Sequence, residues 1–209
     1  MIQMNSSFLL SLVFSSLFIQ SCRESNFKSN QHLVQEQSKL NKMLNILPDT
    51  SINSVLFLNN SSSIQKVFGD VMPLLNKEAD LPDLYMFSNS KQEYLRLVFL
   101  PGSSKNSISQ FEVGYLKKMP KGVKATDSRL AIIVTESNIT LGISKLQVIK
   151  LKGNDYKEEK NGEETVVEYN VNDFESSVFL KRYNMPSYFA KYWFFEDKLI
   201  KFRFGFEYP

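Results

Sequence analysis

The chain has 209 residues, and its 25 Lys and Arg against 22 Asp and Glu give a net charge of only +3. This balance argues against a strongly basic nucleic-acid-binding protein. The single His and single Cys exclude a Cys/His zinc site and an internal disulfide within one chain. A Ser-His-Asp or Cys-His mechanism would have to use His32, which lies among Gln and Asn and is more simply a solvated surface residue.

The chain opens with a short apolar segment. Residues 8–19 are apolar apart from Ser, which is too short to span a bilayer but suits the apolar region of a secretory signal. The following Gln20-Ser21-Cys22 places a small residue before the sole Cys and resembles the lipobox of bacterial lipoproteins. The resemblance implies a signal peptide over residues 1–21, cleavage after Ser21, and lipidation of Cys22 with fatty acyl chains such as palmitate. An ordinary secretory signal or an uncleaved anchor, with Cys22 incidental, is the alternative.

Lipidation has a direct consequence for location. Several acyl chains, at about 0.8 kcal/mol per buried methylene, hold a soluble domain on a membrane almost permanently. No later apolar run is long enough to span a bilayer. We therefore expect a soluble body held by lipid in the cell envelope, at the outer membrane, with the leaflet left open.

Residues 22–50 predict a tether followed by a helix. The first part, to about Asn30, is polar. Apolar residues then recur at helical spacing between Gln31 and Leu47, and Pro48 ends that pattern.

Two later segments predict short helices with matching patterns. In residues 139–153, Ser144 and Gln147 form a potential capping box and Gly153 can end the helix. A strand is the alternative there, because Val148, Ile149 and Leu151 are good strand formers. Residues 55–69 repeat the apolar spacing and the final Gly, although chance similarity remains the competing explanation.

Strand-like runs follow each predicted helix, with Pro, Gly and Asn between them. The runs lie near residues 84–87, 94–100, 111–116 and 130–135, and then near 165–171, 188–195 and 199–206. The predicted fold class is therefore α+β, with two similar halves over residues 51–136 and 137–209. Each half would hold a short helical unit and an antiparallel β-meander.

The motif Leu141-Gly142-Ile143-Ser144, followed by Val148 and Gly153 and then by strands, resembles the SmpA/OmlA (BamE-type) outer-membrane lipoproteins and the tandem β-lactamase-inhibitor-protein fold. The resemblance covers roughly residues 52–209. It implies a fold that docks onto other proteins and is not catalytic. No site residue of the family can be assigned to a position in this sequence.

The C-terminal hairpin provides the candidate binding surface. From Ile200, the last strand alternates, with Ile200, Phe202, Phe204 and Phe206 on one face. An odd-length loop near Glu196-Asp197 would place Tyr188, Ala190, Tyr192 and Phe194 on the same face. The opposite face would then carry aromatic and cationic residues typical of protein-binding surfaces, namely Phe189, Lys191, Trp193, Leu199, Lys201 and Arg203. Packing of this face against the rest of the protein is the alternative.

Other charged clusters point to loops. Residues 154–164 mix Asp, Glu and Lys around Asn161-Gly162, which is typical of a solvated hairpin tip. We predict no catalytic residue, no metal, no cofactor and no nucleic-acid partner. The predicted function is a lipid-anchored, non-catalytic module for protein interaction or assembly support, with an envelope protein as partner. The alternatives are a secreted inhibitor of a periplasmic enzyme, a small-ligand-binding lipoprotein, and an enzyme with carboxylate chemistry. The sequence leaves the oligomeric state open.

Overall fold

The computed structural model describes residues 47–76, 81–90, 92–100, 107–121 and 123–207. They belong to one compact unit, Asn45–Pro209. The predicted signal peptide, Cys22, His32 and the predicted helix up to residue 46 lie outside the described residues.

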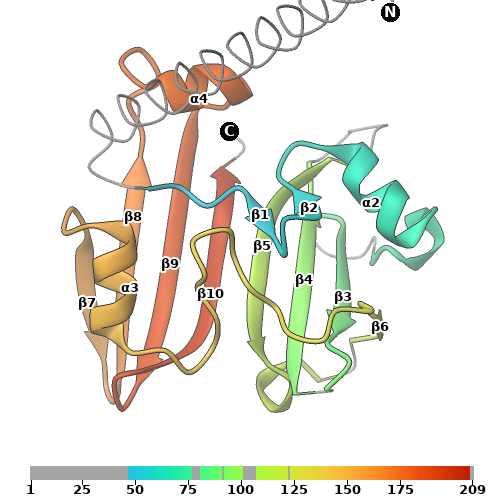
Figure 1. Cartoon of the computed structure of the whole chain (residues 1–209), viewed down its shortest axis with the longest axis horizontal. Helices are drawn as coiled ribbons and strands as arrows, with labels where there is room; N and C mark the ends of the chain where they lie inside the picture. The colour runs from blue at the N-terminus through green and yellow to red at the C-terminus, as the bar shows by residue number, and fades with distance from the viewer. Residues whose placement is uncertain (1–46, 77–80, 91, 101–106, 122, 208–209) are drawn as a thin grey trace, which may run out of the picture. The chain divides into compact units, whose positions relative to one another are not determined.

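Strands form most of the regular structure in this unit, and eight of them build one sheet in the order β6-β3-β4-β5-β10-β9-β8-β7 (Figure 1). The sheet strands are β3 (Asp83–Phe87), β4 (Glu93–Phe99), β5 (Ile108–Tyr115), β6 (Ala125–Asp127), β7 (Lys157–Asn161), β8 (Glu164–Val171), β9 (Ser187–Phe195) and β10 (Lys198–Glu207). The remaining elements are the pair β1 (Ser51–Ile52) and β2 (Leu56–Phe57), the helices α2 (Ser61–Phe68), α3 (Lys145–Lys152) and α4 (Val178–Tyr183), and the 3-10 turns η1 (Met72–Leu74) and η2 (Leu116–Lys118).

The predicted fold class, α+β in two similar halves with a meander each, is wrong. The fold is mostly β, and the strands of both predicted halves join in a single sheet, because β10 pairs with β9 on one side and with β5 on the other. At this junction Phe204 lies opposite Phe111, and their ring centroids are 5.4 Å apart. The helices of the described residues are short, so they cover the sheet in places and do not define a layer for each half.

Both predicted short helices are confirmed. Asn60 caps α2 by accepting from the backbone N–H of Ser63, and Ser144 caps α3 in a complete capping box with Gln147. Each helix ends at a glycine with a positive φ, 74° at Gly69 and 96° at Gly153. The strand alternative for residues 148–151 is therefore excluded.

The strand predictions fail where burial is incomplete. The run at 130–135 forms no strand, and Ile132 in it is 59% exposed. The segment 157–161 forms the edge strand β7 although all five of its residues are polar and exposed. An edge strand needs no apolar face, and charges on it discourage pairing with other chains. Helix α4 was also missed, although Ser177 caps it and Asn184 ends it in the left-handed conformation.

One face of the sheet, here called the helix face, lies beneath α2 and α3 (Figure 1). It carries the fully buried side chains of the core, among them Leu95, Leu97, Phe111, Val113, Tyr169, Tyr188, Tyr192, Phe194, Phe202 and Phe204. Burial of each such side chain stabilises the fold by about 2 kcal/mol. Helices α2 and α3 add Ile64 and Val148 to this core.

A buried ion pair ties the start of the described chain to α3. The Nζ of Lys152 lies 2.5 Å from the Oδ2 of Asp49, and the two side chains are 1% and 0% exposed. The same ammonium donates to the carbonyl of Leu47 and to the hydroxyl of Ser137. Burial lowers the pKa of Lys152, and Asp49 partly offsets that effect. The backbone of Asp49 also exchanges two hydrogen bonds with the hydroxyl of Tyr188 on β9.

The odd-length loop predicted for the β9–β10 hairpin is wrong, and the predicted apolar face is correct except at Ile200. The loop has two residues, Glu196 and Asp197, both with positive φ as a type I′ turn requires. A β-bulge between Leu199 and Lys201 then shifts the register by one residue. Phe202 therefore lies opposite Tyr192, as the alternation predicted, but Leu199 pairs with Phe194 and is fully buried.

Candidate functional site

The face of the sheet opposite the helix face, here called the back face, is the candidate site. Since side chains alternate along a strand, the paired registers place one set of residues on this face. That set includes Asp83 and Tyr85 of β3, Tyr94 and Arg96 of β4, Gln110, Glu112 and Gly114 of β5, Lys201 and Arg203 of β10, Phe189, Lys191 and Trp193 of β9, and Glu164 and Glu168 of β8. Aromatic rings and charges of both signs therefore alternate across six strands.

The part of the back face on β3 and β4 is a packed ion pair. The Nη2 of Arg96 lies 2.6 Å from the Oδ2 of Asp83, and its Nε donates to the same oxygen at 2.7 Å. The guanidinium also lies 5.4 Å from the ring centre of Tyr85. Asp83 is 1% exposed, and its Oδ1 has no hydrogen-bond partner among the described residues. The two contacts with Asp83 and the ring of Tyr85 restrict the Arg96 side chain.

The centre of the back face is built around a glycine. Tyr94 lies across Gly114, where an added Cβ would come within 2.6 Å of the tyrosine ring. The Tyr94 hydroxyl donates to the Oε1 of Glu112 at 2.8 Å. Burial, followed by the negative charge of Glu112, raises the pKa of Tyr94 far above its ordinary value, so this hydroxyl stays a donor. The contact fixes the Glu112 carboxylate below the surface, where it is 9% exposed.

The central strands β5 and β10 carry a second planar cation. The Nε of Arg203 donates to the Oε1 of Gln110 at 2.9 Å, and its Nη2 donates to the same oxygen. The guanidinium lies 5.8 Å from the ring centre of Phe189. Burial lowers the pKa of Arg203, while Glu112 acts in the opposite direction. Because a guanidinium stays protonated in proteins, Arg203 is a cation whose hydrogen-bond partner, the Gln110 amide, is neutral.

The more accessible part of the back face lies on β8, β9 and β10. The Nζ of Lys201 stands 3.9 Å from the ring centre of Trp193, a close cation–π contact. Beside it, Lys191 lies 3.2 Å from the Oε2 of Glu168, and their side chains are 36% and 28% exposed. These half-exposed groups can contact another molecule without any change in the sheet.

The back face contains five of the six residues predicted as a binding surface. Phe189, Lys191, Trp193, Lys201 and Arg203 lie together on it, although Phe189 is only 5% exposed. The sixth, Leu199, lies on the helix face because of the bulge, and Ile200 takes its place beside Trp193. Four further residues of this face, Tyr85, Tyr94, Arg96 and Glu112, were not predicted from the sequence. Alternation in β4, where Tyr94 and Arg96 interleave with Leu95 and Leu97, was a usable signal.

A cleft of 210 Å³ opens on this face. It lies where the segment after β5 passes near the sheet, and its walls are Tyr94, Glu112, Gly114, Lys118, Pro120, Glu164, Trp193, Ile200 and Lys201. Lys118 reaches across to the Oε1 of Glu164 at 3.7 Å. Apolar walls at Pro120, Trp193 and Ile200 therefore meet charges of both signs at one place.

A second, larger cleft of 680 Å³ lies at the outer edge of β3. Its walls include Leu74, Asp83, Tyr85, Lys121 and Lys124. The volume is within the range of small-molecule sites. Within the described part of the chain, no group of three or more His, Cys, Asp or Glu side chains is placed to hold a metal ion. The described helices are also all too short or too polar to cross a bilayer.

Comparisons with known proteins give little further guidance. No protein-family model matches the sequence, and neither does any curated protein. Among solved structures, the 1.5 Å crystal structure of an extracellular protein containing a SCP domain, from Bacillus anthracis str. Ames, matches with 13% sequence identity and a TM-score of 0.39. The match covers 76% of this chain and 46% of that chain, so this chain spans less than half the length of that protein. Similarity at this level supports no statement about function, and the resemblance to SmpA/OmlA proteins stays a prediction.

Proposed function

We propose that this protein is a lipid-anchored protein of the cell envelope, held in the outer membrane through Cys22, whose back face binds another protein. The proposal assigns it a role in protein interaction or assembly support and no catalytic residue. The observation that carries the proposal is the half-exposed group of Trp193, Lys201, Lys191 and Glu168 on a sheet face away from the helices.

The chemistry of this group suits protein recognition. Trp and Arg are frequent anchors of protein interfaces, and Trp193 lies at the rim of a cleft into which a partner side chain fits. The charges around it are held by neighbours: Lys201 by the Trp193 ring and Lys191 by Glu168. Ordered side chains lose little conformational entropy when a partner binds.

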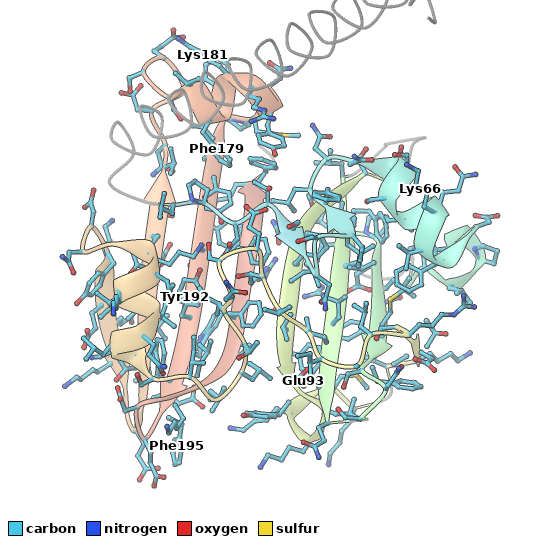
Figure 2. All side chains as sticks on the ribbon, viewed as in Figure 1. Lys66, Glu93, Phe179, Lys181, Tyr192 and Phe195 are labelled. Atoms are coloured by element: carbon cyan, nitrogen blue, oxygen red, sulfur yellow. The ribbon has the colours of Figure 1, made fainter. Side chains whose placement is uncertain are left out.

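Photo-crosslinking tests the binding surface. A photoreactive amino acid at Lys191, in the full chain expressed in its own cells, should give one discrete adduct on irradiation. The same amino acid at Lys66 on α2, which Figure 2 shows away from β9, is the matched control and should give none. Trp193→Ala should abolish the Lys191 adduct while the protein stays folded. Equal adducts at both positions, or none at either, would contradict a docking role for the back face.

Mass spectrometry of the native protein tests the anchor. The expected mature chain begins at Cys22 and carries fatty acyl chains, and Cys22→Ala should leave the protein unlipidated and released from the membrane fraction. An unmodified Cys22 in the membrane-bound protein would refute lipid anchoring without bearing on the back face.

The larger cleft favours a second candidate, a small-ligand-binding lipoprotein. Its 680 Å³ volume combines apolar walls with the buried Asp83 and the exposed Lys121 and Lys124. Native mass spectrometry of the protein purified from its own cells would reveal a retained small molecule. Its loss in a Leu74→Arg variant would locate it in this cleft, and a ligand-free spectrum would count against this role.

A further inference from the structure

The segment that follows β5 is a run of exposed positive charge. Between Lys117 and Lys124 the sequence has four lysines and no acidic residue. Lys117, Lys118, Lys121 and Lys124 are all exposed. Only Lys118 makes an ion pair within the described residues, a loose one of 3.7 Å with Glu164. This basic segment therefore carries charge that the described part of the protein does not neutralise.

The basic segment forms one wall of the Trp193 cleft. Lys118 and Pro120 of this segment line the cleft together with Trp193, Ile200 and Lys201 of the β9–β10 hairpin. Lys201 contributes a further cation, which contacts the Trp193 ring and no described carboxylate. Two cations from different parts of the chain, Lys118 and Lys201, therefore share one lining with the apolar residues.

Two carboxylates also line the cleft. The Glu112 carboxylate is almost buried and accepts the hydrogen bond of Tyr94. Glu164, whose side chain is 40% exposed, is the one accessible carboxylate of the cleft wall. Among the other cations of the back face, Arg96 and Lys191 have the carboxylate partners Asp83 and Glu168, whereas Arg203 is bound to the neutral amide of Gln110. The surplus positive charge therefore lies on Arg203 and on the basic segment, of which Lys118 lines this cleft and Lys121 and Lys124 line the larger one.

We propose that the Trp193 cleft binds an acidic segment of the partner protein, with an apolar side chain on Trp193, Ile200 and Pro120. Carboxylates of that segment would bind Lys118 and Lys201 in the cleft and Lys121, which follows Pro120 outside it. In the free protein, Glu164 occupies the position next to Lys118 that a partner carboxylate takes. This inference rests on the proposed function and names the chemistry of the partner.

The shape of the site favours a protein segment over an anionic membrane surface. A flat layer of lipid headgroups reaches the exposed lysines of the basic segment, but Trp193 and Ile200 are only partly exposed behind them. A peptide side chain can enter the 210 Å³ cleft, since that volume is close to the size of one large side chain. Electrostatic attraction would then bring the partner in, and the apolar floor would hold it.

Trp193 is the only tryptophan of the chain, so its fluorescence reports on the cleft directly. The full chain, reconstituted in phosphatidylcholine vesicles, is titrated with a short peptide of glutamate and leucine and with a matched peptide of lysine and leucine. The acidic peptide should change the fluorescence saturably, and the basic peptide should not. Raising the salt from about 0.05 M to about 0.5 M should weaken binding, because charges at the surface are screened.

Charge reversal locates the binding. Lys118→Glu with Lys121→Glu leaves the Trp193–Lys201 contact in place and should weaken binding of the acidic peptide by about tenfold or more. Lys66→Glu with Lys150→Glu, an equal change of charge on α2 and α3, should alter it by less than about twofold.

Three results would overturn the inference. The first is no fluorescence response to the acidic peptide at low salt. The second is equal weakening by both pairs of substitutions, which would indicate unspecific attraction. The third is a response to phosphatidylglycerol in the vesicles without any peptide, which would assign the lysines to the membrane surface. A specific crosslink from Lys191 together with any of these results would retain the proposed function and reject an acidic partner.

Discussion

The two faces of the sheet use the same strands for different purposes. Along β9, Tyr188, Tyr192 and Phe194 point to the helix face and are at most 1% exposed. Lys191 and Trp193, between them, point to the back face and stay partly accessible. The helix face stabilises the fold by apolar burial, whereas the half-exposed pair Lys191–Glu168 of the back face contributes little stability. This difference is the reason to look for binding on one face and for stability on the other.

Truncation of one ring on each face gives the largest contrast. Phe202→Ala on the helix face removes a fully buried ring and should lower the free energy of unfolding by about 4 kcal/mol. Trp193→Ala on the back face should cost clearly less, because its ring is partly solvated already. Chemical denaturation followed by circular dichroism measures both. Equal losses would mean that the back face is part of the core.

The next largest effect on stability is expected at the buried ion pair Lys152–Asp49, which joins α3 to the segment before β1 on the helix face. Lys152→Met leaves the Asp49 carboxylate buried without its partner and should cost about 3 kcal/mol. The double variant Lys152→Met with Asp49→Leu should recover much of that loss, since no charge is then left unpaired. Thermal unfolding of the single and double variants tests this. A double variant less stable than Lys152→Met alone would contradict the explanation.

Alkaline pH should destabilise the fold through its buried tyrosines, of which Tyr192 lies on the helix face. Burial raises the pKa of Tyr192 well above 10, whereas in the unfolded chain it titrates near its ordinary value. The raised pKa contributes stability that is complete below pH 10 and is lost above it, by about 1.4 kcal/mol per pH unit for each such tyrosine. Lys152, with its lowered pKa, acts in the opposite sense below 10.5.

Tyr192→Phe isolates this effect. The Tyr192 hydroxyl is buried without a hydrogen-bond partner in the described residues, so its removal should leave stability at pH 7 unchanged or higher. The variant should lose less stability than the parent between pH 10 and pH 11. Denaturant titrations at several pH values provide the measurement, and parallel curves for the two proteins would disprove the assignment.

The smallest effect is expected at the surface pair of the back face. Lys191→Ala breaks the 3.2 Å contact with Glu168 but should change the free energy of unfolding by less than about 1 kcal/mol. If the proposed interface is correct, the same substitution weakens partner capture more than it weakens the fold. A loss of stability matching that of Lys152→Met would give the pair a structural role.

Local signals in the sequence predicted local structure well. Ser144 marked the start of α3, the final glycines marked the ends of α2 and α3, and the alternation from Phe202 to Phe206 identified the buried side of β10. The pairing of β10 with β5 could not be predicted, because it joins residues about ninety positions apart and depends on which free edges meet. The bulge that exchanged Leu199 and Ile200 was equally hidden, since one extra residue in a strand leaves no compositional mark.

The place of β10 in the sheet has a consequence for biogenesis. It is the last described strand in the chain, yet it lies between β5 and β9 near the middle of the sheet. While it is still being made, β5 and β9 each have an unpaired edge, and the core lacks Phe202, Phe204 and Phe206. The sheet can therefore close only after synthesis has passed Glu207. A nascent chain that is late to fold is one that a translocation channel can still thread, which is compatible with the export that we propose.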